Sequence, residues 1–350
     1  VLNSIVVLKD VTDIEKTQKI NLHIQKKDAE TGEAKPQGYG SFEGAEYSVF
    51  WYDPIENIEK LIGKIVTDAF GKGSLKGLRP LVYKIKETKA PKGYLLDETV
   101  KLIKAGVKEI NTAEFDYSAE SPEIPTTVEI KKTGLNKVGV KEQVKGAVLQ
   151  LFKEDGTFIE EWTTDGNVKT FKGLEIGKYR IYEKEAPEGY IKRDKDVYFE
   201  VKAVAETQKT DVFNERIPKL SSFAKFDTGV KESKKLDEVK VIDRIYYQDV
   251  IPGKEYTLFG SLVDRNGKPL RVRDNDVIHD MKKFTPEKVA GYIDLEYTLN
   301  PKKLEKLGFD ITELTAYVNI RKDGKMLAQH NDFNDELEKV RFPEIKTTLT

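Results

Sequence analysis

The sequence predicts an all-β chain of tandem antiparallel β-sandwich domains arranged as an elongated rod. Short segments that alternate apolar and polar residues, such as "INLHIQ", "AVLQLF" and "VYFEV", recur along the 350 residues. This period of two is typical of half-buried strands. Turn tetrapeptides such as "EDGT", "TDGN" and "DRNG" stand between them and are typical of hairpins. Short strands at regular spacing with frequent turns favour sandwiches.

Proline-bearing joints divide the chain. "ESPEIPTT", "NERIPKL" and "RFPEIKTT" each connect the end of one strand-rich stretch to the start of the next. We therefore expect a first block at residues 21–124, a second at 125–217 and a third at 218–342. Because the joints are short and contain proline, the rod should be semi-rigid. Residues 1–20 are expected to be the tail of a preceding domain or linker, and residues 343–350 the start of a following domain.

The first block is longer than the second between its early strand and its repeated motif. We expect residues 53–79 to be an insertion that decorates one side of the block, and residues 53–66 to be either a helix or part of that insertion. Phe50, Trp51, Tyr52 and Phe70 lie in or near it. These aromatic residues are either core residues or the place where a ligand would bind.

The composition excludes several classes of function. Acidic and basic residues number 60 and 59, and this balance argues against nucleic acid as a partner. There is no cysteine and there are only three histidines, so we expect no disulfide, no metal and no cofactor. No apolar run approaches the roughly 20 residues of a membrane span.

One long pattern is written twice, as "YKIKETKAPKGY" at 83–94 and "YRIYEKEAPEGY" at 179–190. Its fifth position is Glu87 in the first copy and Glu183 in the second. Each Glu follows a run that reads as a strand. A carboxyl group that points from a strand into a core is costly unless another group there uses it.

When the first two blocks are aligned on the repeated motif, each has a lysine near its start, and the second has an asparagine near its end. These residues could react with the help of the buried Glu. "LHIQKKD" gives Lys26, "VEIKKTG" gives Lys132, and "DVFNERIP" places Asn214 in the last strand of the second block. Burial disfavours the charged forms of amine and carboxyl groups, so the lysine becomes a nucleophile and the glutamic acid a proton carrier. Attack of the amine on the side-chain amide would release ammonia and leave an isopeptide bond between the first and last strands.

These features resemble the CnaB-type domains of Gram-positive surface adhesins and pilins. In that family, the box Tyr-x-Leu-x-Glu-x-x-Ala-Pro-x-Gly-Tyr carries the catalytic Glu of a self-formed Lys–Asn or Lys–Asp isopeptide bond. The second block is similar throughout, including "GAVLQLFKEDG" and its terminal Asn. The resemblance implies Ig-like sandwiches in both blocks, and in the second a Lys132–Asn214 bond catalysed by Glu183.

The first block departs from the family pattern in its last strand, which reads "INTAEFDYSAESPEIP". Aligning "EFDY" with "VFNE" makes Asp116 the counterpart of Asn214. With Glu87 as catalyst, Lys26 and Asp116 would then form a bond with loss of water. A different anchoring of the alignment selects Ser118 or Ser121, in which case no bond forms.

The third block is similar to the VaFE-repeat domain, which carries a Thr–Gln ester bond, most clearly over "DRIYYQDVIPGKEYTLFGSLVD". At the reactive places, the resemblance gives Ser222 for the Thr and Glu338 for the Gln. Asp243 and His330 match the assisting Asp and His, whereas Val318 stands where the family has an assisting Glu. We therefore expect the sandwich fold with a degenerate site that forms no ester. Thr347 repeats the place of Ser222, which predicts a further VaFE-type domain after this one.

These inferences predict a structural stalk segment of a Gram-positive cell-wall-anchored adhesin or pilin, located outside the cell. Its partners would be further domains of the same adhesin, and the chain would be a monomer. It would be no turnover enzyme, because the crosslinking reaction consumes its own side chains. The alternatives are a ligand-binding module for a host extracellular-matrix protein and a pilin backbone subunit.

Overall fold

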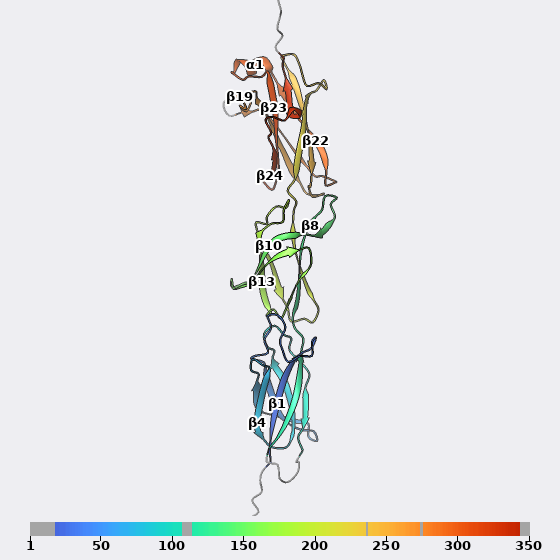
Figure 1. Cartoon of the computed structure of the whole chain (residues 1–350), viewed down its shortest axis with the longest axis vertical. Coiled ribbons are helices and arrows are strands. Elements are labelled where there is room, and N and C mark those ends of the chain that lie inside the picture. Colours follow the sequence, from blue (N-terminus) through green and yellow to red (C-terminus); the bar gives the residue numbers. More distant parts are fainter. Residues whose placement is uncertain (1–17, 107–113, 236, 274–275, 344–350) are drawn as a thin grey trace, which may run out of the picture.

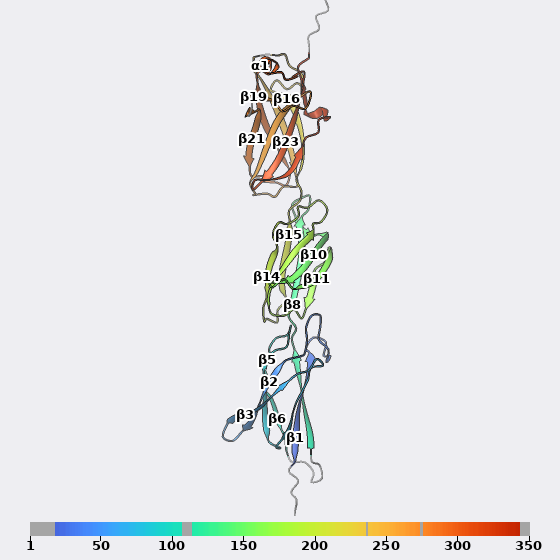
Figure 2. The ribbon, with the colours of Figure 1, turned by 90° about the vertical axis from the view of Figure 1, so that its left-hand side faces the viewer.

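The computed structural model describes residues 18–106, 114–235, 237–273 and 276–343. Their strands form three groups along one long axis (Figure 1), and a view at right angles shows the same extended shape (Figure 2). Each group of strands surrounds its own apolar core. The predicted all-β rod of tandem sandwiches is therefore confirmed. Most of the two predicted flanking segments, together with Thr347, lies outside the described residues.

The first block is a sandwich of two sheets, with strand orders β4-β1-β7 and β3-β2-β5-β6. Its strands are β1 (Lys19–Asp28), β2 (Glu46–Asp53), β3 (Ile58–Val66), β4 (Lys72–Leu78), β5 (Val82–Lys89), β6 (Lys101–Lys104) and β7 (Glu114–Glu123). Alternation fixes which side of β1 faces the core, because Ile20, Leu22 and Ile24 are all buried and residues two apart lie on one face of a strand. Lys26 follows in the same phase.

The predicted insertion at 53–79 is wrong. Strand β3 pairs with β2 and strand β4 pairs with β1, so this stretch supplies one strand to each sheet. The hairpin of β2 and β3 projects to one side of the block (Figure 2). Strand β3 has no clear alternation of burial, since Ile58, Leu61 and Ile62 are all exposed. This edge position explains why its sequence does not read as a strand.

The second block repeats this arrangement, with sheets ordered β11-β10-β13-β14 and β12-β8-β15 and with β9 paired to β8. Its strands are β8 (Thr127–Leu135), β9 (Lys141–Gln143), β10 (Lys145–Lys153), β11 (Phe158–Asp165), β12 (Lys169–Lys172), β13 (Gly177–Glu185), β14 (Val197–Val201) and β15 (Gln208–Asn214). Strands β11 and β12 occupy the places of β3 and β4. Val128 and Ile130 face the core, and Lys132 continues their phase.

The first and last strands of these two blocks lie side by side and run parallel. Strand β1 pairs with β7, and strand β8 pairs with β15. The expectation of wholly antiparallel sandwiches is corrected here. Because the chain enters and leaves each block through neighbouring strands, side chains near the two ends of a block can meet across the pair.

The third block contains sheets ordered β16-β17-β22 and β21-β18-β23-β24, with β25 paired to β23 and a small β19-β20 sheet. Its elements are β16 (Lys219–Phe226), β17 (Val239–Gln248), β18 (Tyr256–Asp264), β19 (Arg271–Arg273), β20 (Asp276–Val277), β21 (His279–Phe284), β22 (Gly291–Leu299), α1 (Pro301–Lys306), β23 (Glu313–Lys322), β24 (Lys325–His330), η1 (Glu336–Glu338) and β25 (Lys339–Arg341). Helix α1 begins after Asn300, whose side chain caps it by accepting from the Lys303 N–H. Within the described residues, none of the helices has the length and apolar character of a membrane span.

Backbone contacts join the first block to the second. The Thr126 N–H donates to the Gly93 carbonyl at 3.0 Å, and the Gly173 N–H donates to the Thr126 carbonyl at 2.9 Å. Gly93 and Gly173 both have positive φ, at +80° and +70°, and a Cβ on Gly93 would lie 2.2 Å from the Gly173 oxygen. The two chain segments approach this closely because neither residue has a side chain.

The change Gly173→Ala should disrupt the backbone contact between the first and second blocks. Its Cβ would lie 2.4 Å from the Gly40 nitrogen, and the left-handed backbone alone costs about 1–2 kcal/mol for a residue with a Cβ. We expect small-angle scattering to show a wider spread of angles between the first two blocks. Gly156→Ala is the matched control, because Gly156 also has a positive φ but open space around it. An equal spread in both variants would contradict the proposed role of the close approach.

Candidate functional site

The inward phase of three strands brings Lys132, Glu183 and Asn214 together inside the second block. Lys132 follows Ile130 on β8, and Glu183 follows Ile181 on β13. Asn214 is the last residue of β15. The three residues are 2%, 3% and 1% exposed. The structure therefore brings these three residues together in one buried cluster.

The three side chains contact one another directly. The Lys132 amine donates to the Asn214 Oδ1 and to the Val212 carbonyl, and its Nζ lies 2.9 Å from the Glu183 Oε1. The Asn214 amide donates to the Glu183 Oε1 at 2.9 Å and to its Oε2 at 2.8 Å. One carboxyl group therefore lies against both the amine that would attack and the nitrogen that would leave.

The surroundings of the cluster hold this geometry and favour a neutral amine. Burial lowers the pKa of Lys132, while its hydrogen bond to Glu183 acts in the opposite direction. The Arg193 N–H donates to the Glu183 Oε2 at 2.9 Å, and the Asn214 amide also donates to the Ile191 carbonyl at 2.9 Å. The Glu183 carboxyl group and the Asn214 amide are thus each oriented by a backbone group that the sequence did not indicate.

In the first block, Lys26 and Glu87 meet as predicted, but Asp116 does not join them. Lys26 pairs in register with Ser121, whereas Asp116 pairs with Asn21 five residues earlier on β1. The Asp116 side chain is 70% exposed and contacts His23 at 3.1 Å. The predicted Lys26–Asp116 pair is therefore wrong. Matching "EFDY" to "VFNE" selected a residue near the start of β7, whereas Lys26 lies beside the end of that strand.

Glu123 takes the place that the sequence assigned to Asp116. The Lys26 Nζ lies 2.5 Å from an oxygen of Glu87 and 2.5 Å from an oxygen of Glu123, and all three side chains are 0% exposed. Ser121, one of the alternatives, donates its hydroxyl to Glu123 at 2.9 Å, whereas Ser118 pairs in register with His23. Alternation along β7 was the available signal, since Ser121 and Glu123 share one phase.

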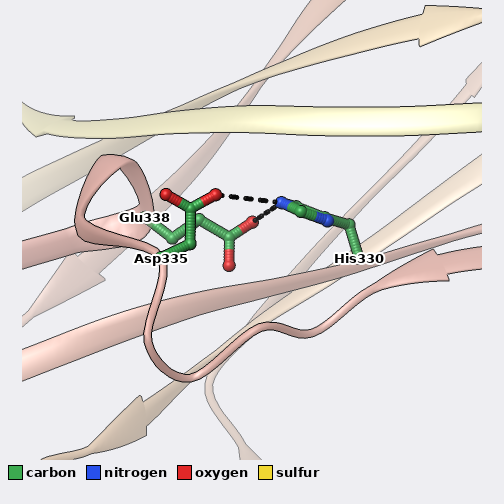
Figure 3. A group of neighbouring side chains, drawn as sticks. All are labelled: His330, Asp335 and Glu338. Carbon is green, nitrogen blue, oxygen red and sulfur yellow. Dashed lines mark hydrogen bonds and ion pairs between the residues drawn. The ribbon is translucent and has the colours of Figure 1, made fainter.

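The degenerate site of the third block is also brought together. The Ser222 hydroxyl donates to the Glu338 Oε1 at 2.6 Å. His330 contacts the same oxygen at 3.1 Å and the Asp335 carboxylate at 3.3 Å (Figure 3). Val318 is buried on β23 and pairs in register with His330. Asp335, which also caps η1, is the member of this group that the sequence did not indicate.

Burial dominates the electrostatics of this third site. It raises the pKa of Glu338 to about 8 and that of Asp243 to about 7. The Ser222 hydroxyl donates a hydrogen bond to Glu338, and among the described residues neither Asp243 oxygen has a hydrogen-bond partner. His330, Asp335 and Glu338 each offer one possible metal-ligand atom, all within 4.8 Å of one another. The direct contacts of His330 with both carboxyl groups account for this geometry.

The aromatic residues near the hairpin of β2 and β3 differ in exposure. Phe50, Trp51 and Tyr52 are half-buried on β2, and the Lys84 amine lies 3.5 Å from the centre of the Tyr52 ring. Phe70, between β3 and β4, is 74% exposed. Only Phe70 among the four is therefore freely available to a ligand.

Comparison with known proteins gives two family matches. A model for the SpaA prealbumin-like fold domain matches residues 20–120 and 126–216. A model for the T-Q ester bond containing domain matches residues 218–341. Among curated protein sequences, the comparison found no match.

Several solved structures are similar to the chain. The Bacillus anthracis TIE protein is 20% identical with a TM-score of 0.39, over 93% of this chain and 49% of that one. BcpA, the major pilin subunit of Bacillus cereus, is 17% identical with a TM-score of 0.37, over 59% and 66%. The C-terminal fragment of pilus adhesin SpaC from Lactobacillus rhamnosus GG is 16% identical with a TM-score of 0.38, over 57% and 98%.

The chain thus spans about half of the length of the first of these proteins. The prealbumin-like model covers more than half of this chain and coincides with the two blocks that contain the buried Lys–Glu clusters. The chain belongs to the SpaA prealbumin-like fold domain family, with a T-Q ester bond containing domain after its two SpaA-type domains.

Proposed function

We propose that the chain is a load-bearing stalk segment of an adhesin or pilin on the surface of a Gram-positive cell, clasped by an isopeptide bond in its second block. One observation carries the proposal, namely that Glu183 contacts both the Lys132 amine and the Asn214 amide inside a buried cluster. Its partners are further domains of the same surface protein. The reaction happens once per molecule, because Lys132 and Asn214 are consumed.

The atoms of the reaction balance within the cluster. The lone pair of the neutral Lys132 Nζ attacks Cγ of Asn214, and Glu183 takes a proton from Nζ as the bond forms. The bond from Nζ to Cγ forms, the bond from Cγ to Nδ2 breaks, and Glu183 returns the proton to the leaving nitrogen, so that ammonia departs. A general acid–base group must lie within hydrogen-bond reach of both atoms that exchange the proton, and Glu183 does so at 2.9 Å to each.

A bond at this place serves a stalk. It joins β8 to β15, the parallel neighbours through which the chain enters and leaves the block, so tension passes through side chains and bypasses the sandwich. The loop that it closes spans a sequence separation of 82 residues. By analogy with disulfides, a loop of this size would stabilise the block by roughly 4.5 kcal/mol.

The third block would have no such clasp. Glu338 offers a carboxyl group where the amide donor of an ester-forming site would stand, so hydroxide or water would have to leave in place of ammonia. Val318 offers no carboxyl group for proton transfer. Ser222, His330 and Glu338 remain as a hydrogen-bonded cluster that contributes to folding without a covalent bond.

Replacing Glu183 by Ala should prevent formation of the Lys132–Asn214 isopeptide bond. The intact mass of the wild-type chain should be low by one ammonia from this block, and its digest should contain a branched peptide that joins Lys132 to Asn214. Glu183→Ala removes the group that relays the proton, so its digest should contain linear peptides alone from these positions. Glu185→Ala, at the exposed last position of the same strand, should keep the branched peptide. Linear peptides in the wild-type digest would overturn the proposal for this block.

The stability of the third block should fall as pH rises from about 5 to about 8.5. The folded-state pKa values of Asp243 and Glu338, about 7 and about 8, lie above the ordinary values near 4. Stability from the protonated forms is therefore present at low pH and lost as pH passes through the folded values, by at most about 1.4 kcal/mol per pH unit for each group.

Hydrogen exchange of peptides from the third block, measured in the whole chain, checks this pH dependence. Exchange should be corrected for its intrinsic rate at each pH. Asp243→Asn should flatten the dependence, and Glu287→Gln, at an exposed position, should leave it unchanged. A protection that rises with pH would show that these acids are ionised in the folded block.

Pulling single molecules from both ends should extend the third block fully and the second block only slightly. The reason is that the Lys132–Asn214 bond shields most of the second block from tension, whereas the third block is held by non-covalent contacts. Force spectroscopy of the whole chain would measure the two extensions. A third block that resists extension until the chain detaches would disprove the absence of a crosslink there.

A further inference from the structure

We propose that the first block carries its own covalent clasp, an amide between Lys26 and Glu123 with Glu87 as the proton-relaying catalytic residue. This inference rests on the proposed function, since it uses the same chemistry with a different acyl donor. It assigns Glu123 a role that the sequence pattern of the first block does not suggest, because the expected Asn or Asp is absent from that place.

Strand register makes Glu123 the counterpart of Asn214. Lys132 pairs with Val212, and Asn214 is two residues further along β15. Lys26 pairs with Ser121, and Glu123 is two residues further along β7. The bridges beyond these strands agree, since Tyr94 pairs with Pro125 and Tyr190 pairs with Arg216, in each case two residues after the acyl donor.

The catalytic carboxyl group is held in the same way in both blocks. The Glu183 Oε2 accepts the N–H of Arg193, ten residues later, at 2.9 Å. The Glu87 Oε2 accepts the N–H of Asp97, also ten residues later, at 2.6 Å. In both blocks this leaves Oε1 for the lysine amine, which lies 2.5 Å from Glu87 and 2.9 Å from Glu183.

The Glu123 side chain reaches the amine despite the methylene that distinguishes Glu from Asp. Its Oε1 lies 2.5 Å from the Lys26 Nζ and accepts the Ser121 hydroxyl at 2.9 Å. Its Oε2 is buried without a hydrogen-bond partner among the described residues. The acyl carbon is therefore next to the nucleophile, with one oxygen oriented by two donors and the other not held by any.

The charges of this cluster favour condensation. One ammonium and two carboxylates in a fully buried site would leave one negative charge uncompensated, and burial raises the pKa of Glu123 to about 7. A neutral Glu123 is an acid that can react with an amine. In water, hydrolysis of an amide is favoured largely by ionisation of the released acid and amine, and burial removes much of that gain because it disfavours both charged forms.

The atoms balance with loss of water. Glu87 takes a proton from the Lys26 amine, Nζ attacks Cδ of Glu123, and the bond between Nζ and Cδ forms. The bond between Cδ and the protonated oxygen of Glu123 breaks, and the proton held by Glu87 completes the leaving water. No oxidant, metal or other reactant is needed.

The test compares intact masses of the whole chain with those of three variants. The wild-type chain should lack one water in addition to the ammonia lost by the second block. Glu123→Gln should give the same final mass as the wild type, since a glutamine donor loses ammonia and leaves an identical amide. Glu123→Ala should lose only the ammonia of the second block. Asp116→Ala should retain both losses, which separates Glu123 from the donor that the sequence suggested.

Two further readouts keep the result decisive. Glu87→Gln preserves the shape of the site but cannot take a proton from the amine, so it should keep Lys26 and Glu123 in linear peptides. Hydrogen exchange of β1 and β7 peptides would confirm that this variant is folded. Linear Lys26 and Glu123 peptides in a folded wild-type chain would overturn this inference alone. A missing Lys132–Asn214 peptide would instead overturn the proposed function.

Discussion

The structure depends on ionisable side chains that occupy core positions of β-strands. A strand buries every second residue, so Lys26 and Lys132 enter the cores simply because they continue the phase of the isoleucines before them. A buried ammonium is strongly destabilising unless it is paired or neutralised. The Glu of the repeated motif pairs with the buried lysine in each of the first two blocks. The parallel pairing of the first and last strands brings Glu123 next to Lys26 and Asn214 next to Lys132.

The three blocks meet the constraint of buried charge in different ways. The second contains lysine, glutamic acid and an amide. In the first, a second carboxyl group replaces the amide. In the third, Ser222, Asp243, His330 and Glu338 take these places, and burial raises the pKa values of its two acids. These are related solutions of one problem, namely how to keep polar groups inside a narrow sandwich without leaving net charge there.

The sequence indicated those parts of the structure that follow from short-range regularity. Alternation and the repeated motif were sufficient to find Lys132, Glu183 and Asn214, because each belongs to a strand with a clear inward phase. Asp116 was chosen from a local match of letters, whereas the true register is set by pairing between strands almost a hundred residues apart. Strand β3 was not predicted because it is an exposed edge strand, in which apolar and polar residues need not alternate. Glu123 was missed for the same reason as Asp116 was chosen. Alternation along β7 places Glu123 on the inward face with Ser121, but only the pairing of β7 with β1 shows that this face meets Lys26.

The glycine contact between the first two blocks has a consequence for the motion of the molecule. Linkers made of flexible residues let neighbouring modules reorient almost independently. Here the Gly93 and Gly173 backbones lie against each other and are connected through Thr126 by hydrogen bonds on both sides. A twist applied at one end of this pair is therefore transmitted as torque to the other end. The first two blocks should therefore reorient together rather than independently, because bending at this joint would break both hydrogen bonds.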